Sequence, residues 1–214
     1  TAQLDDISVG PPEDFRNFLN AVIDERAFDK IVGYIEHVRE ADDAEILYGG
    51  DYDDSTGYFI EPTLVRAHAP NEKAMREEIF GPVTTVYVYP DEEYASTLSL
   101  VDDTSPYGLT GSIFARDRAA IKLASDVLEQ AAGNFYVNDK PTGAVVGQQP
   151  FGGARRSGTN DKAGSAYNLM QWVSPRAIKE NFDPATHYSY AWNQPDATEH
   201  PSESRTEAGD GAVA

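Results

Sequence analysis

Apolar residues recur at helical spacing between Asp24 and Glu40, where they form one stripe along an otherwise charged segment. The stripe consists of Phe28, Ile31, Val32, Ile35 and Val38. This spacing predicts a surface helix with one buried side.

Short runs rich in β-branched and aromatic residues predict strands in five other places. These runs lie at residues 45–50, 58–65, 83–89, 109–115 and 133–139. Pro62 within the second run indicates an edge strand or a bulge, because proline cannot donate to a strand ladder.

Two further helices are expected between these strands. One follows Asp91, a plausible cap, with Leu98 and Val101 on its inner face, and the other runs from Asp117 to Gln130. Strands that alternate with helices of this length are typical of βαβ units. The expected fold class is therefore α/β, with a mainly parallel sheet and flanking helices.

The C-terminal part of the chain changes character after these elements. The segment "NLMQWVSPRAIKE" at residues 168–180 is strand-like as far as Pro175. Beyond Trp192 the sequence has almost no apolar residues and much Pro, Ser, Gly and charge, so we expect residues 193–214 to form a disordered tail.

Charge and cysteine content exclude several classes of function. Asp and Glu number 36 against 17 Lys and Arg, a net charge of −19, so nucleic acid is not an expected partner. Such acidity is associated with proteins from salt-loving organisms, so we expect a halophilic source, with a simple need for solubility as the alternative. The chain has no cysteine, which excludes disulfides and a cysteine nucleophile within it.

The sequence offers no membrane segment and no metal motif. No apolar run approaches the roughly 20 residues that span a bilayer and no basic-then-apolar leader opens the chain, so we expect a cytoplasmic location without a membrane partner. The four histidines, His37, His68, His187 and His200, lack ligand-like spacing, and no metal is expected. The calcium-loop-like run at 51–57 fails because its glycine falls one place late and its twelfth position is Pro62.

Two unusual segments remain once phosphate-binding and hydrolase motifs have been found absent. The first, "EEIFGP" at 77–82, places two carboxylates before an aromatic residue and a turn, where a carboxylate can accept hydrogen bonds from paired hydroxyls. The second, at 141–158, is glycine-rich and exposes backbone N–H groups that can hold an anion such as a carboxylate. Solvated glutamates and a long connecting loop are the simpler interpretations of the two segments.

In this order, the two segments resemble the aldehyde dehydrogenase superfamily. The matching motifs are E-I-F-G-P at 78–82 and P-F-G-G-A-R-R-S-G at 150–158. The longer run at 131–164 is similar to the branch that oxidises L-glutamate γ-semialdehyde, the 1-pyrroline-5-carboxylate dehydrogenases of proline degradation. The resemblance covers roughly residues 10–190.

The resemblance implies a role for individual residues and a cofactor, NAD. Glu78 would accept hydrogen bonds from the nicotinamide ribose and Phe80 would pack near the nicotinamide. Gly143 and Ala144 would offer backbone N–H groups to the carboxylate of the substrate, and Phe151 would line its aliphatic part. The substrate would be L-glutamate γ-semialdehyde and the product L-glutamate.

The resemblance also implies what this chain lacks, namely the nucleophilic cysteine, the general-base glutamate and the Rossmann domain. We therefore expect residues 1–12 to be the ragged start of a fragment, 13–167 a partial catalytic domain, 168–192 an oligomerisation segment and 193–214 the tail. The chain alone should be inactive, whether it comes from a truncated gene, a partial sequence or a split enzyme with a separate N-terminal half. The alternative is a non-catalytic binding or oligomerisation module. The full-length enzyme would be a homo-oligomer.

Overall fold

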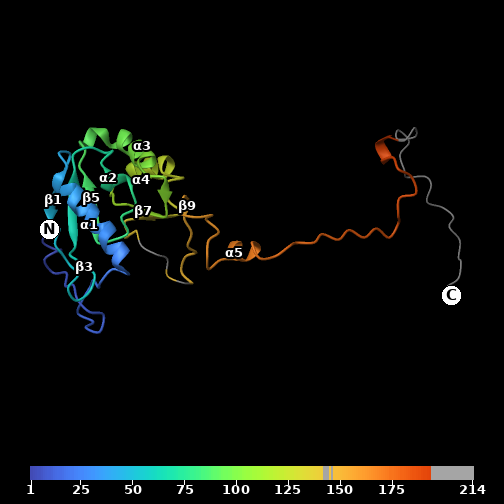
Figure 1. Ribbon diagram of the computed structural model, residues 1–214. Coiled ribbons are helices and arrows are strands. Elements are labelled where there is room, and N and C mark those ends of the chain that lie inside the picture. Colours follow the sequence, from blue (N-terminus) through green and yellow to red (C-terminus); the bar gives the residue numbers. More distant parts are fainter. Residues whose placement is uncertain (142–144, 146, 194–214) are drawn as a thin grey trace, which may run out of the picture. The chain divides into compact units, whose positions relative to one another are not determined.

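The computed structural model describes residues 1–141, 145 and 147–193 (Figure 1). It contains two units, Thr1–Val173 and Ser174–Ala214. The first unit holds every α-helix and strand of the described residues, whereas the described part of the second has one short 3₁₀ helix, η2 (Ala191–Asn193). The site must therefore be sought in the first unit.

Helix α1 (Glu25–Glu40) confirms the first predicted helix. Asp24 caps it, because its carboxylate accepts a hydrogen bond of 2.7 Å from the Ala27 N–H. The buried side of the helix holds Phe28, Ile31, Tyr34, Ile35 and Val38, of which only Tyr34 is absent from the predicted stripe. Its periodic apolar pattern is thus what fixes the face that α1 turns to the core.

Helix α1 packs on a three-stranded sheet in the order β1–β4–β5 (Figure 1). The strands are β1 (Ala44–Tyr48), β4 (Thr63–Ala67) and β5 (Val83–Tyr87). The connection between β1 and β4 contains only the hairpin of β2 (Tyr52–Asp53) and β3 (Phe59–Ile60), whereas α2 (Lys73–Arg76) lies between β4 and β5. Pro62 accordingly splits the predicted strand 58–65 into β3 and β4.

The second half of the unit contains two more strand pairs. Strands β7 (Thr110–Ile113) and β8 (Asn134–Val137) are parallel, and α4 (Arg118–Val127) connects them. Strands β6 (Tyr107–Gly108) and β9 (Ala154–Arg155) are antiparallel. The remaining elements are the 3₁₀ turn η1 (Asp91–Glu93), α3 (Tyr94–Thr104) and α5 (Ala166–Met170).

The expectation of one mainly parallel sheet is correct only in part. The fold is mixed α/β with four small sheets, in which β4–β5 and β7–β8 are parallel and the other three pairings are antiparallel. Parallel neighbours need a crossover, usually a helix, and both parallel pairs have one. The β1–β4 connection has no helix, and its strands are antiparallel.

Two details of α3 differ from the prediction. Asp91 begins η1 rather than capping the α-helix, whose N-cap residue, Glu93, makes no side-chain capping bond. Leu98 is buried as predicted, but Val101 is 51% exposed. The helix therefore buries a narrower face than its apolar residues suggest, and Leu98 packs there with Ala124 and Leu128.

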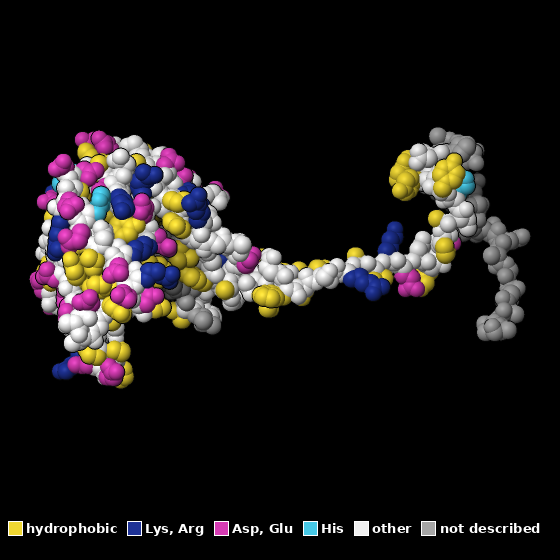
Figure 2. Space-filling model, viewed as in Figure 1, with side chains coloured by type: hydrophobic (Ala, Val, Ile, Leu, Met, Phe, Trp, Pro, Cys, Tyr) yellow, Lys and Arg dark blue, Asp and Glu magenta, His cyan; other side chains and the backbone are white. Residues whose placement is uncertain are grey.

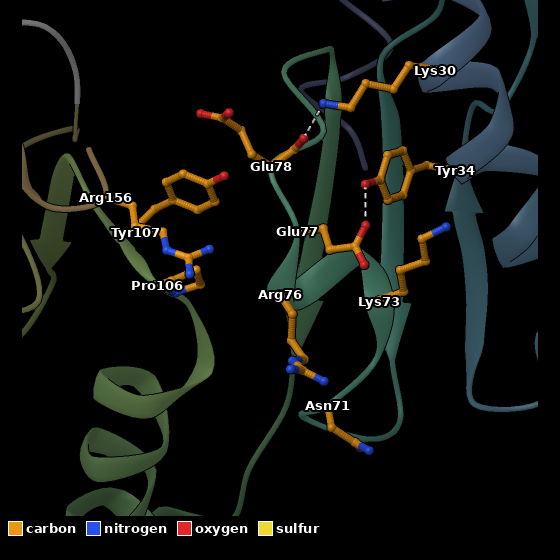
Figure 3. Close-up of a pocket in the computed structure, with 10 residues that line it drawn as sticks. All are labelled: Lys30, Tyr34, Asn71, Lys73, Arg76, Glu77, Glu78, Pro106, Tyr107 and Arg156. Carbon is orange, nitrogen blue, oxygen red and sulfur yellow. Dashed lines mark hydrogen bonds between the residues drawn. The ribbon is translucent and has the colours of Figure 1, made fainter. Parts of the chain in front are cut away.

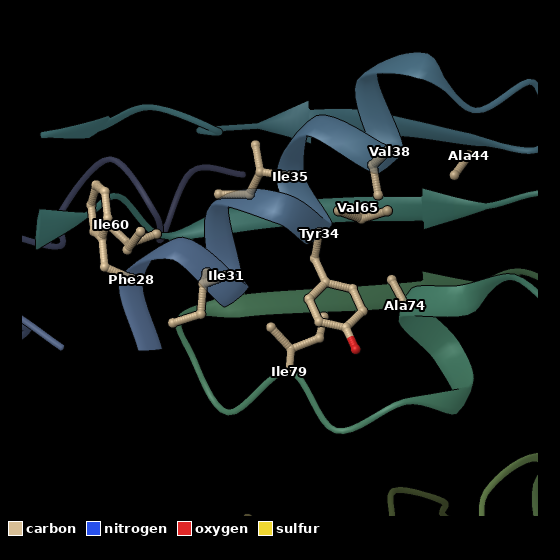
Figure 4. Close-up of a cluster of buried hydrophobic side chains, with 10 residues drawn as sticks. All are labelled: Phe28, Ile31, Tyr34, Ile35, Val38, Ala44, Ile60, Val65, Ala74 and Ile79. Carbon is tan, nitrogen blue, oxygen red and sulfur yellow. The ribbon is translucent and has the colours of Figure 1, made fainter. Parts of the chain in front are cut away.

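The apolar core consists of two clusters. In the larger, α1 lies over β4 and over the segment from Ala74 to Ile79, as Figure 4 shows, and Ile31 and Ile35 have no exposed surface. The smaller cluster comprises Leu98, Ala124 and Leu128 from the region of α3 and α4. No residue belongs to both, so the first unit contains two separate centres of packing.

The strand expected within residues 168–180 is wrong. Residues 166–170 form α5, and no strand is found from there to Asn193, the last described residue. A strand needs a partner backbone, and no strand pairing among the described residues involves this segment, in which Trp172 is 82% exposed. Its role in oligomerisation stays a prediction, and the tail lies outside the described residues apart from Asn193.

The surface of the first unit reflects the acidic composition. Acidic side chains are spread over the face shown in Figure 2, with lysines and arginines between them. Within the described residues no helix combines the length and apolar content needed to cross a membrane. Because acidic side chains outnumber basic ones, mutual repulsion between unpaired carboxylates destabilises the folded chain, and salt can screen this repulsion.

We predict that added NaCl stabilises this chain. Between about 0.1 M and about 1 M the Debye length falls from about 10 Å to about 3 Å, which weakens repulsion between surface carboxylates. The midpoint of thermal unfolding should rise over this range. In the double variant Asp54→Lys, Glu129→Lys, which replaces two exposed acids, the rise should be smaller. Equal rises in both proteins would contradict the prediction.

Candidate functional site

The E-I-F-G-P turn follows α2 and leads directly into β5, so its residues lie where β5 enters the three-stranded sheet. The two adjacent glutamates have different surroundings. Glu77 accepts a hydrogen bond of 2.6 Å from the Tyr34 hydroxyl, while the Glu78 carboxylate has no hydrogen-bond partner among the described residues. The free carboxylate is therefore that of Glu78, the residue which the sequence predicts to bind ribose.

Phe80 has an unusual backbone and an unusual environment. Its φ angle is +62°, in the left-handed region that bulky residues avoid, and its side chain is 83% exposed. A conformation of this kind costs about 1–3 kcal/mol and persists only where neighbouring contacts impose it. Such strain gathers at ligand sites, so the turn is a candidate for one.

A pocket of about 550 Å³ opens beside this turn (Figure 3). Four of its ten lining residues are cationic and two are anionic, the reverse of the balance in the whole chain. The lining residues are Lys30, Tyr34, Asn71, Lys73, Arg76, Glu77, Glu78, Pro106, Tyr107 and Arg156. The pocket therefore offers an anionic ligand a locally favourable potential.

Residues from α1 hold one wall of the pocket. The Lys30 Nζ donates to the backbone carbonyl of Glu78 at 2.5 Å, and the Glu78 carboxylate points away from it (Figure 3). The Lys73 ammonium lies 4.8 Å from the centre of the Tyr34 ring. The cation nearest to the turn thus binds its backbone and leaves the Glu78 carboxylate free.

Tyr34 titrates far from its ordinary range. Burial, together with the hydrogen bond to the Glu77 carboxylate, raises the pKa of Tyr34 to about 12. Near neutral pH its hydroxyl is therefore protonated and acts as the donor to Glu77.

The glycine-rich loop is built around Asn134 of β8. The Asn134 side chain donates to the Pro150 carbonyl at 3.0 Å and accepts from the Gly152 N–H at 3.1 Å. Gly133 lies so close to the Gly152 carbonyl that an added Cβ would be 1.9 Å from it. The loop is thus held tightly to β8, which explains why glycine is needed at position 133.

Phe151, at the centre of this loop, is half-buried. Its backbone pairs with Ala163 through hydrogen bonds of 2.9 Å and 2.8 Å. Phe151 does not line the pocket at Glu78, and neither does Phe80. Of the residues that the sequence predicts to bind cofactor or substrate, only Glu78 lines it, while Gly143 and Ala144 lie outside the described residues.

The adjacent arginines serve different ends. Arg155 donates to the Asp102 carbonyl at 2.5 Å, to the Ser105 carbonyl at 3.2 Å and also to the Asp102 carboxylate, so its side chain ties the loop to the end of α3. Arg156 makes no side-chain hydrogen bond or ion pair within the described residues and lines the pocket. Of the two arginine side chains, only that of Arg155 therefore holds the loop, whereas Arg156 contributes through its backbone N–H, which donates to the Pro106 carbonyl at 3.1 Å.

Sequence reasoning missed most of the pocket lining. Lys30 and Tyr34 lie four residues apart in the predicted helix, so the sequence alone could indicate that their side chains share one face of it. Their contacts with residues 77 and 78 span more than 40 positions of sequence, and no local pattern marks them. Within the described residues no group of three or more metal-binding side chains occurs.

Comparison with known proteins places the chain in a family. The model of the aldehyde dehydrogenase family matches residues 1–178. The chain belongs to the aldehyde dehydrogenase family. The E-I-F-G-P turn and the glycine-rich loop both fall within the matched part of this aldehyde dehydrogenase chain.

Curated relatives narrow the resemblance to one group of aldehyde dehydrogenases. A Dictyostelium discoideum protein named mitochondrial delta-1-pyrroline-5-carboxylate dehydrogenase is 56% identical over 186 residues, which are 87% of this chain and 33% of that protein. The Homo sapiens protein of that name is 54% identical over 189 residues, 88% of this chain and 34% of the relative.

Solved structures agree with these relatives. A crystal structure of the delta-pyrroline-5-carboxylate dehydrogenase from Mycobacterium tuberculosis matches with a TM-score of 0.77 and 49% identity, over 88% of this chain and 35% of that chain. The same enzyme bound with NAD matches with a TM-score of 0.76 and 51% identity, over 88% of this chain and 34% of that chain. This aldehyde dehydrogenase chain therefore spans about a third of the length of its relatives.

We predict that the stability of this aldehyde dehydrogenase chain falls at alkaline pH through Tyr34. The pKa of Tyr34 is raised from 10.0 to about 12 on folding, so its contribution is complete below pH 10 and is lost as the pH rises to about 12. Relative to Tyr34→Phe, which cannot ionise, the natural chain should lose about 2–3 kcal/mol of unfolding free energy over that range. Urea unfolding of both proteins tests this, and parallel pH profiles would refute it.

Proposed function

We propose that this chain contributes the nicotinamide-ribose contact and part of the substrate pocket to an NAD-dependent 1-pyrroline-5-carboxylate dehydrogenase. The complete enzyme would oxidise L-glutamate γ-semialdehyde to L-glutamate in proline degradation. Support comes from the family membership, from relatives named for this activity, and from a relative solved with NAD bound. In this proposal the chain is a C-terminal part of the catalytic domain without the Rossmann domain.

The observation that carries the proposal is the free carboxylate of Glu78 beside a cationic pocket. A carboxylate without an internal partner can accept hydrogen bonds from both hydroxyls of a ribose. The cations around it would favour a ligand that carries phosphates. These residues thus fit an NAD molecule, which when bound would serve as the hydride acceptor.

Phe80 and the glycine-rich loop complete the proposed site. The exposed Phe80 ring would cover the nicotinamide end of the cofactor, since aromatic faces pack well on flat rings. The Phe151 ring would line the methylene groups of the substrate, and the backbone at Gly143 and Ala144 would hold its carboxylate. In this scheme the chain binds and orients both reactants.

The bond-forming step needs a group that this chain does not contain. In aldehyde dehydrogenase chemistry a cysteine thiolate adds to the aldehyde to form a thiohemiacetal. Loss of a hydride to NAD converts the thiohemiacetal into a thioester, which water then hydrolyses to release the carboxylate and the thiol. The chain has no cysteine, so the nucleophile must come from elsewhere, such as a separate N-terminal half. A homo-oligomer and a cytoplasmic location remain parts of this proposal.

The first test measures NADH production from L-glutamate γ-semialdehyde. The chain alone should show none, and addition of the missing N-terminal part, taken from a close relative, should restore turnover. In the restored enzyme Glu78→Gln should lose more activity than Glu77→Gln, because only Glu78 has a free carboxylate. Turnover by the chain alone, or equal loss in the two variants, would contradict the proposal.

A non-catalytic binding or oligomerisation module is the second candidate. Exposed apolar residues near α5 favour an assembly role, among them Leu169 at 66% and Trp172 at 82% exposure. If the chain works in this way, sedimentation should show a stable oligomer of the chain alone. A monomer that gains activity with an N-terminal half would reject this candidate.

A further inference from the structure

The turn at residues 77–81 is attached to α1 on both sides of Phe80. Tyr34 binds the Glu77 carboxylate at 2.6 Å and Lys30 binds the Glu78 carbonyl at 2.5 Å. Tyr34 is almost buried, and the contact that it makes spans 43 positions of the sequence. The two hydrogen bonds fix the turn on its N-terminal side.

Apolar packing fixes the other side of the turn. Ile79 is buried in the same cluster as Ile31 of α1. Gly81 lies so close that an added Cβ would be 2.5 Å from the end of the Ile31 side chain. The turn is therefore held at four of its five residues, and Phe80 is the exception.

Phe80 contributes little to holding its own conformation. Its side chain is 83% exposed, so burial of the ring cannot offset its left-handed backbone. The conformation is then imposed by neighbouring contacts, namely those with α1 and the hydrogen bonds of 2.8 Å from the Val83 N–H to the Gly81 carbonyl and from the Thr63 N–H to the Pro82 carbonyl. Helix α1 is therefore both part of the core and a support for the turn that carries Glu78 and Phe80.

The same contacts decide which glutamate is available. Tyr34 occupies Glu77, and Lys30 binds the main chain of Glu78 although its ammonium could pair with a carboxylate. No cation of the described residues lies within 4.0 Å of the Glu78 carboxylate oxygens. Both contacts thus leave Glu78 open to hydroxyl donors from a ligand.

We infer that Lys30 and Tyr34 are positioning residues for the nicotinamide-ribose site. Through the hydrogen bonds to residues 78 and 77 they hold the turn, which keeps the Glu78 carboxylate free and the Phe80 ring outside the core. The ribose part of this inference rests on the proposed function. The held turn does not, since it follows from the contacts alone.

The test uses the full chain with 4-fluorophenylalanine at position 80, so that ¹⁹F NMR reports on the turn. The variants are Lys30→Met, Lys30→Arg and Tyr34→Phe, each of which keeps a similar side-chain volume. The control is Lys122→Met on α4, whose ammonium pairs with Asp126 on an exposed surface. Hydrogen exchange of the Val83 amide, which donates to the Gly81 carbonyl at 2.8 Å, gives a second, independent measurement.

Lys30→Met and Tyr34→Phe should shift the ¹⁹F signal toward that of free fluorophenylalanine. They should also speed exchange of the Val83 amide by about tenfold, the factor expected for loss of a hydrogen bond to a charged group. Lys30→Arg should restore the natural values because it keeps a donor, and Lys122→Met should match the natural chain. Natural spectra and exchange in both Lys30→Met and Tyr34→Phe would overturn the inference.

Addition of nicotinamide mononucleotide distinguishes a failure of the proposed cofactor site from a failure of the positioning role of Lys30. The ¹⁹F signal of the natural chain should shift with this ligand, and Lys30→Met should need about ten times more ligand for the same response. A natural chain that does not respond would overturn the proposed cofactor role and the ribose assignment with it. A response that Lys30→Met retains at full affinity would overturn only the positioning inference.

Discussion

The packing of α1 into the larger core cluster is the constraint on which the rest of this structure depends. Ile31 and Ile35 are fully buried, so the helix can neither rotate nor slide without exposing apolar surface. An α-helix places residues 30, 31 and 34 on adjoining parts of one side. The same burial that stabilises the core therefore fixes the Lys30 ammonium and the Tyr34 hydroxyl at the turn.

The pocket also resolves an electrostatic conflict. A chain with a net charge of −19 repels anions on average, yet a dinucleotide cofactor is an anion. Its cationic lining gathers Lys30, Lys73, Arg76 and Arg156, which the sequence supplies from three separate regions. Folding therefore creates a local potential that no stretch of the sequence displays.

The sequence predicts strongly periodic elements well, because local pattern determines them. Helix α1 and the strands β1, β5, β7 and β8 are found where the patterns place them. Sheet arrangement is predicted less well, since strand direction depends on the connections and not on the strands. The strand expected at 168–180 fails for a related reason, because strand formation depends on a partner that the local sequence does not contain.

The candidate site shows the same division between local and distant information. The motif marks Glu78 and Phe80. That the Glu78 carboxylate is free and that the Phe80 backbone is strained depends on contacts of the turn with α1. These contacts join positions more than 40 residues apart, and a single sequence gives no sign of them. Family resemblance supplies the expected roles, while the structure supplies the reason that Glu78 and not Glu77 is available.

The separation of the core into two clusters has a consequence for cooperativity. The pocket is lined on one side by residues attached to the larger cluster, such as Tyr34, and on the other by Pro106 and Tyr107, which follow α3 of the smaller one. Two centres without shared buried residues can open as separate sub-global units. A molecule that contacts both walls must be released before either cluster opens. Occupancy of the pocket would therefore make the two clusters unfold as one cooperative body.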